Sequence, residues 1–120
     1  MIKISRLCKS FFYSFKGIYK TWREEQNLQI QSLAALLVVF LGFYLGITLR
    51  EWILLIFAIF LVFITELINS ALERVSDVLK PRINGYVKEI KDIMAGAVML
   101  ASILALIIGL LIFLPYFLNY

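Results

Sequence analysis

Residues 52–77 read WILLIFAIFLVFITELINSALERVSD. The first fourteen of these carry no charge, and an ionisable residue, Glu66, follows them directly. At about 1.5 Å per residue, an apolar helix of this length crosses most of the hydrocarbon core of a bilayer. The helical pattern then continues through polar residues. We therefore expect one helix over residues 52–79 that crosses a membrane and projects from its surface.

Two further apolar runs predict two more membrane-spanning helices. Residues 28–47 are almost wholly apolar after Gln29 and Gln31, and residues 86–118 contain a long apolar run. Residues 1–25 alternate basic and apolar side chains at helical spacing, which predicts an amphipathic helix lying on the membrane surface. The expected fold is a single all-α membrane domain with an N-terminal surface helix and three transmembrane helices.

Short polar or aromatic segments mark the expected ends of these helices. Residues 48–51 are predicted to form a polar turn, and Pro81 and Gly85 are predicted to break the second span. Aromatic residues suited to the membrane interface stand near the span ends: Trp52, Tyr116, Phe117 and Tyr120.

Composition excludes several classes of chemistry. The chain of 120 residues is 62% hydrophobic and only 17% charged, which a soluble domain of this size does not need. With a single cysteine and no histidine, it can form no intrachain disulfide, no cysteine-based metal site and no histidine-based catalytic centre. The net charge of +4 is more typical of membrane orientation than of nucleic-acid binding.

The basic residues predict an orientation in the membrane. Six of the twelve Lys and Arg residues lie in residues 1–23, five lie in residues 74–91, and Arg50 stands alone in the other loop. The positive-inside rule then places the N-terminus and the loop after the second span in the cytoplasm. With three spans, the C-terminus is expected outside a cytoplasmic (inner) membrane.

The candidate chemistry begins at the end of the second span. A helix places five polar side chains within a sector of about 100° there: Glu66, Asn69, Ser70, Glu73 and Asp77. An ionisable residue inside a span is costly unless it faces a partner or a wet cavity, which favours a functional stripe. The plainer alternative is that Glu66 reaches the interface and that Glu73 and Asp77 are the solvated end of the helix.

Two other polar clusters are expected at the same cytoplasmic level. Residues 22–31 carry Glu24, Glu25 and Asn27 at the entry to the first span, although acidic residues also suit a helix N-terminus. Lys91 and Asp92 precede the third span and could be an ordinary interfacial pair. Converging carboxylates could instead hold Mg²⁺, and Lys91 could neutralise phosphate. No Gly-rich nucleotide loop of a known soluble type is present.

Four blocks of sequence resemble a known family. They are FKG at residues 15–17, Glu25-x-Asn27, ELINSALE at residues 66–73 followed by Asp77, and KD at residues 91–92 followed by AGAV at residues 95–98. In content, order and spacing they resemble the prokaryotic diacylglycerol kinase family, which includes the undecaprenol kinases. Three positions depart from the family pattern: Gln29, Gln31 and Ser76.

The resemblance implies a lipid kinase that uses ATP and Mg²⁺, assembled as a homotrimer with active sites shared between subunits. It implies that Glu66 is the general base and that Glu25 and Glu73 hold the metal. The residues implied around the phosphates and the base are Asn69, Asp77, Lys91 and Asp92, and those along the nucleotide and lipid headgroup are Arg6, Lys9, Tyr13 and Ser14.

A second function remains open from the residues alone. A non-catalytic membrane assembly subunit could use Glu66, Asn69 and Ser70 only to hydrogen-bond neighbouring helices. Assembly by itself, however, requires neither Glu25 nor Asp92. Within the kinase interpretation, the acceptor could be diacylglycerol or undecaprenol.

Overall fold

The computed structural model describes residues 1–79 and 84–118. In these residues the chain forms four helices, which are α1 (Ile4–Glu24), α2 (Gln26–Leu45), α3 (Leu49–Leu79) and α4 (Asn84–Leu118). The fold predicted from the sequence, a shorter first helix followed by three long apolar helices, is confirmed. Pro81 and Tyr120, for which a helix break and an interfacial aromatic were predicted, lie outside the described residues.

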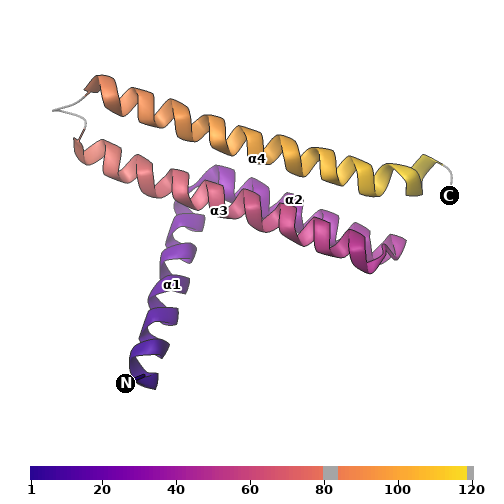
Figure 1. Ribbon diagram of the computed structural model, residues 1–120, viewed down its shortest axis with the longest axis horizontal. Coiled ribbons are helices and arrows are strands. Elements are labelled where there is room, and N and C mark those ends of the chain that lie inside the picture. Colours follow the sequence, from indigo (N-terminus) through magenta and orange to yellow (C-terminus); the bar gives the residue numbers. More distant parts are fainter. Residues whose placement is uncertain (80–83, 119–120) are drawn as a thin grey trace.

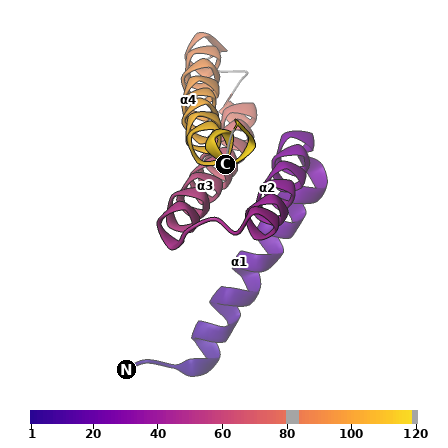
Figure 2. The same cartoon turned by 90° about the vertical axis from the view of Figure 1, so that its right-hand side faces the viewer.

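Three of the helices form a bundle, and α1 extends away from it (Figures 1 and 2). α3 packs along α4 over most of its length, and α2 lies beside α3. α1 meets the bundle only near its C-terminal end, close to where α2 begins. This arrangement suits a surface helix joined to a membrane-spanning bundle.

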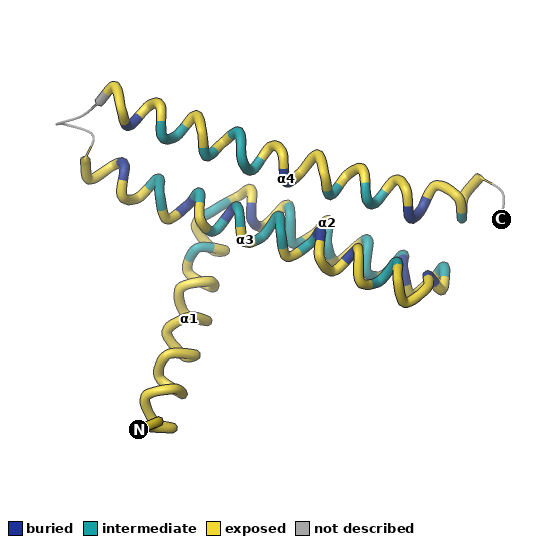
Figure 3. Tube along the Cα trace, viewed as in Figure 1, coloured by how far each residue is buried: buried dark blue, intermediate teal, exposed yellow. Residues whose placement is uncertain are grey.

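The bundle is a membrane bundle by its surface as well as by its length. The most apolar stretches of α2, α3 and α4 have mean hydropathies of 2.0, 2.4 and 3.0, respectively. Exposed positions run along all three helices (Figure 3), and large apolar residues occupy many of them: Phe40, Phe57 and Leu100 are 71%, 62% and 65% exposed. Contiguous apolar exposure on this scale is unfavourable in water and favourable in lipid.

The connection between α2 and α3 differs from the polar turn predicted for residues 48–51. The Glu51 Oε1 atom accepts a hydrogen bond from the Thr48 N–H at 2.9 Å, and the Glu51 N–H donates to Thr48 Oγ1 at 3.3 Å. This reciprocal pattern is a capping box, which starts the helix directly after Thr48. The prediction was wrong here, because Glu51 belongs to the first turn of α3.

Two glycines also correct the predicted helix ends. Gly46 has a left-handed backbone with φ 65°, and its N–H donates to the Gly42 carbonyl at 3.0 Å. Such a residue ends a helix, so α2 stops at Leu45 rather than at residue 47. Gly85 lies within the first turn of α4 and does not separate the helices.

The end of the bundle near the α2–α3 connection has its own small core. Ile47, Leu55, Ile112 and Phe113 are buried there together. The Tyr116 hydroxyl donates a hydrogen bond of 2.5 Å to Glu51 Oε1, joining the last turns of α4 to the first turn of α3. This contact fixes the end of the bundle opposite to the polar stripe.

Candidate active site

The carboxyl group of Glu66 lies at the centre of the polar end of the bundle. Glu66 is only 2% exposed, and its Oε2 atom has no hydrogen-bond partner. The side chain of Asn27 hydrogen-bonds with this carboxyl group, and the charges of Glu25 and Glu73 act on it. The start of α2 therefore places one amide against Glu66, and two further carboxyl groups lie near enough for their charges to act on it.

The residues of the predicted polar stripe on α3 differ in how far they are buried. Glu66 and Ser70, one turn apart, are both buried, and the Ser70 hydroxyl has no hydrogen-bond partner. Asn69 and Glu73 are half-buried, and Asn69 Nδ2 lies 3.4 Å from Glu73 Oε1. Asp77 is exposed on the last turns of the helix. The stripe thus runs from a desolvated carboxyl group to a solvated one.

α4 contributes Lys91 to this end of the bundle. The Lys91 Nζ atom lies 2.8 Å from Asp77 Oδ1, and the charge of Glu73 also acts on it. Lys91 therefore pairs with one carboxylate of α3 and interacts electrostatically with a second. A cation in this position can attract an anionic group to the carboxylate cluster and balance its charge.

Asp92 does not join the cluster within one chain. Its Oδ2 atom lies 3.0 Å from Lys88 Nζ, one turn earlier on the same helix, and both side chains are largely exposed. Adjacent helix residues point about 100° apart, and here Lys91 contacts Asp77 of α3 while Asp92 contacts Lys88 of its own helix. The role expected for Asp92 stays a prediction.

The nucleotide residues expected on α1 lie far from the carboxylates of the same chain. Arg6, Lys9, Tyr13 and Ser14 are all exposed on the N-terminal part of α1, which extends away from the bundle (Figures 1 and 2). The Ser14 hydroxyl donates a hydrogen bond of 2.8 Å to the Ser10 carbonyl of its own helix. One chain alone does not bring these residues to Glu66.

Gln29, where the sequence departs from the family pattern, has a structural role. Its Nε2 atom donates to the Trp22 and Arg23 carbonyls at 2.9 Å and 3.3 Å. These are carbonyls of the last turn of α1, which have no partner within that helix. The Trp22 indole N–H donates to Ser32 Oγ at 3.1 Å. Together these bonds hold α1 and α2 at a fixed angle. No pattern in the sequence predicted them.

The donor set fits a magnesium ion that is shared with a nucleotide. Within residues 1–79 and 84–118, no three acidic or cysteine side chains are grouped so that they could hold a metal by themselves. Magnesium, however, is usually held by one or two carboxylates together with substrate phosphates and water. Glu25 and Glu73, whose charges act on Glu66, supply two such carboxylates.

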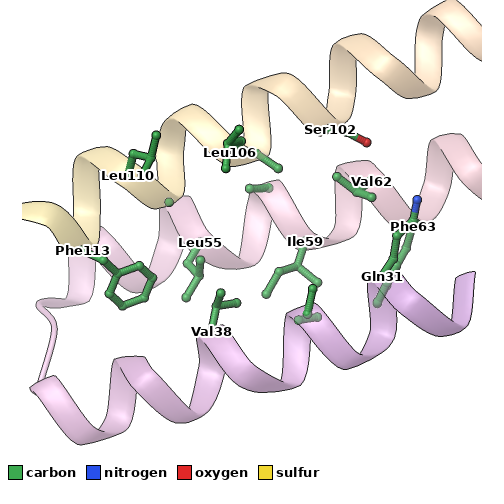
Figure 4. Close-up of a pocket in the computed structure, with 15 residues that line it drawn as sticks. Gln31, Val38, Leu55, Ile59, Val62, Phe63, Ser102, Leu106, Leu110 and Phe113 are labelled. Atoms are coloured by element: carbon green, nitrogen blue, oxygen red, sulfur yellow. The ribbon is translucent and has the colours of Figure 1, made fainter. Parts of the chain in front are cut away.

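A cavity of about 430 Å³ lies between α2, α3 and α4 (Figure 4). Its lining is apolar except for Gln31 and Ser102. A nucleotide triphosphate cannot bind there, because burying its charges among apolar side chains would be costly. The charged side chains described above are not among the residues that line this cavity.

This fold and site define a class: a small all-helical membrane protein with a buried carboxyl group, further carboxylates and a lysine gathered at one end. The model of the prokaryotic diacylglycerol kinase family matches residues 12–113. The chain belongs to that family and is a lipid kinase.

Individual relatives cover most of the chain. It is 37% identical over 113 residues to the undecaprenol kinase of Bacillus subtilis (strain 168), an alignment that covers 94% of this chain and 92% of the relative. It is 33% identical over 103 residues to the diacylglycerol kinase of Escherichia coli (strain K12), covering 86% and 84%. The diacylglycerol kinase of Helicobacter pylori (strain ATCC 700392 / 26695) is 37% identical over 98 residues, covering 82% and 77%. All three relatives are named as kinases, which gives no support to the alternative of a non-catalytic assembly subunit.

Proposed function

We propose that this protein transfers the γ-phosphoryl group of ATP to a lipid hydroxyl, and that Glu66 accepts the proton of that hydroxyl. The observation that carries the proposal is the Glu66 carboxyl group, which is buried and has one oxygen without a partner. A free oxygen at this position is available to a hydroxyl that arrives at the membrane surface. General-base catalysis requires such a group within hydrogen-bond reach of the attacking hydroxyl.

In the proposed step, the lipid oxygen attacks the γ-phosphorus as its proton passes to Glu66. A bond forms between that oxygen and phosphorus, the bond between phosphorus and the β,γ-bridging oxygen breaks, and ADP leaves. The products are a phosphorylated lipid and ADP, so that atoms and charges balance. Positioning and charge neutralisation supply most of the catalysis in reactions of this kind.

The other residues of the site position and neutralise the nucleotide. Glu25 and Glu73 would hold Mg²⁺, which when bound offsets phosphate charge. Lys91 would balance charge on the phosphates, held in place by Asp77 at 2.8 Å. Asn69 would steady Glu73, and Asn27 would orient Glu66. Asp92 is proposed to complete the phosphate surroundings.

The acceptor is proposed to be diacylglycerol or undecaprenol, both of which present a primary hydroxyl at the membrane interface. The relatives named above act on one or the other by name. The similarity to the undecaprenol kinase extends over the larger share of this chain and favours undecaprenol as the first acceptor to assay. Both products would be lipid monophosphates.

The remote position of the nucleotide residues on α1 supports active sites shared between subunits, and we propose that the assembly is a homotrimer. Arg6, Lys9, Tyr13 and Ser14 cannot contact ATP at the carboxylates of their own chain in the arrangement of Figure 1. Sites shared between subunits would let α1 of one copy serve the carboxylates of the next. We also propose that these sites face the cytoplasm of a cytoplasmic membrane, as the distribution of Lys and Arg indicates.

The test is an ATP-dependent lipid phosphorylation assay on detergent-purified protein, run with diacylglycerol and undecaprenol side by side. Glu66→Gln keeps the size of the side chain and its hydrogen bonding to Asn27 but removes the base. We expect the wild type to phosphorylate at least one lipid and the variant to lose roughly 100-fold or more in rate. A folded, oligomeric wild type that is inert towards both lipids with Mg²⁺ present would overturn the proposal.

A further inference from the structure

An ion pair links the last residue of α1 to α3 across 50 positions of sequence. The Arg74 Nη2 atom donates to Glu24 Oε1 at 2.7 Å, and the two side chains are 46% and 47% exposed. α1 otherwise meets the bundle only near this end (Figure 1). The pair therefore lies at the point where the surface helix is attached.

Each member of this pair is the sequence neighbour of a carboxylate in the site. Glu24 directly precedes Glu25, and Arg74 directly follows Glu73. Glu25 itself has an extended backbone, with φ −108° and ψ 112°, and forms the joint between α1 and α2. The Glu25 N–H donates to the Thr21 carbonyl at 2.9 Å. The direction of the Glu25 carboxyl group therefore depends on how this joint is held. A shift of the joint relative to α3 would move Glu25 away from Glu66.

The bonds that brace α1 against α2 do not themselves reach α3. Gln29 and Trp22 connect α1 with α2 alone. Two side-chain contacts between described residues link the braced joint to α3: Asn27, in the first turn of α2, contacts Glu66, and Arg74 donates to Glu24, the last residue of α1. The α1 side of the joint is thus held to α3 by the ion pair between Arg74 and Glu24.

We propose that Glu24 and Arg74 are positioning residues for the phosphoryl-transfer site, which hold the α1–α2 joint so that Glu25 faces Glu66 and Glu73. The inference rests on the proposed function. A half-exposed ion pair contributes little to folding stability. Small displacements of catalytic groups, in contrast, strongly reduce rates. Loss of the pair should therefore lower turnover while the protein stays folded.

The experiment is a charge swap in the full-length protein. Glu24→Arg and Arg74→Glu are made singly and together, and turnover of the better lipid acceptor, the KM for that lipid and the melting temperature are measured. We expect each single variant to lose roughly 10- to 100-fold in kcat with little change in melting temperature or lipid KM. The double variant should recover most of the kcat, because the reversed pair restores the contact.

A matched control separates the pair from general charge effects. Arg23→Glu makes the same Arg-to-Glu change as Arg74→Glu, but at the residue next to Glu24, where the guanidinium lies over the Tyr19 ring of its own helix. It should keep near wild-type kcat, and combined with Arg74→Glu it should rescue nothing. Single swaps with normal kcat, or a double swap that stays as slow as the singles, would overturn the positioning role.

A distance measurement keeps this test independent of turnover. Spin labels on Lys20→Cys and Val78→Cys, both exposed positions, in a Cys8→Ser background report the distance between α1 and the end of α3. The expected result is one narrow distribution with the native or the swapped pair and a broad one with either single variant. An unchanged distribution in the single variants would refute the positioning role, even if the wild type phosphorylates neither lipid and the proposed function has failed.

Discussion

Lys91 on α4 and Asp77 on α3 are joined by an ion pair of 2.8 Å between Nζ and Oδ1. The pair ties the two helices together at the end of the bundle that carries Glu66. It also holds the lysine where the charge of Glu73 reaches it. The same cation can therefore serve the architecture of the site and the neutralisation of phosphate.

Replacing Lys91 should be far more harmful than replacing Lys88, one turn earlier on the same helix. Among the residues that the structure describes, Lys88 pairs with Asp92 of its own helix, and its side chain is 80% exposed. We expect Lys91→Met to lower lipid phosphorylation roughly 100-fold, as the loss of a charge-stabilising donor commonly does, and Lys88→Met to change it little. Initial rates of the two purified variants decide the matter, and equal rates would exclude a specific role for Lys91.

The magnesium requirement should depend on Glu73 but not on Glu89. The charge of Glu73 acts on both Glu66 and Lys91, whereas Glu89 is exposed on the first turns of α4. If Glu73 holds the metal, Glu73→Gln should raise the Mg²⁺ concentration for half-maximal rate by about tenfold or more, and Glu89→Gln should leave it unchanged. The measurement is a magnesium titration at fixed ATP. Coincident titration curves for wild type and Glu73→Gln would contradict the assignment.

The sequence was sufficient for the helices because bilayer thickness and hydropathy leave few alternatives. It was also sufficient to gather Glu66, Asn69, Ser70 and Glu73 on one side of a helix. It could not say which neighbour each would meet, since a sector of about 100° on α3 is wide enough to face α2 with Glu66 and α4 with Asp77. That division depends on how the helices pack.

Two further features of the structure were not predicted from the sequence, for different reasons. The pair between Arg74 and Glu24 joins residues 50 apart and leaves no local pattern, so only the packed structure reveals it. The start of α3 was different, because Thr48 and Glu51 have the spacing of a capping box and could have been recognised. The polar composition of residues 48–51 suggested a turn, but the hydrogen bonds between Thr48 and Glu51 start a helix there.

The contacts of Glu51 should affect stability and not activity. The Tyr116 hydroxyl and the Thr48 N–H both donate to Glu51 Oε1, and this end of α3 lies 15 residues, or about 22 Å, from Glu66. Tyr116→Phe should lower the free energy of unfolding by about 0.6 kcal/mol, a typical value for a hydrogen bond within a membrane bundle. Glu51→Ala also loses the capping box and should lower the free energy of unfolding by about 1 kcal/mol more.

Reversible unfolding in mixed detergent micelles measures the loss of stability in both variants. The control is Tyr44→Phe, at an exposed position near the same end of the bundle. Lipid phosphorylation at a temperature where all variants are folded should match the wild type. If Tyr116→Phe destabilises no more than Tyr44→Phe, or if Glu51→Ala is inactive while folded, then this end of the bundle does not have the purely structural role that its distance from the carboxylates implies.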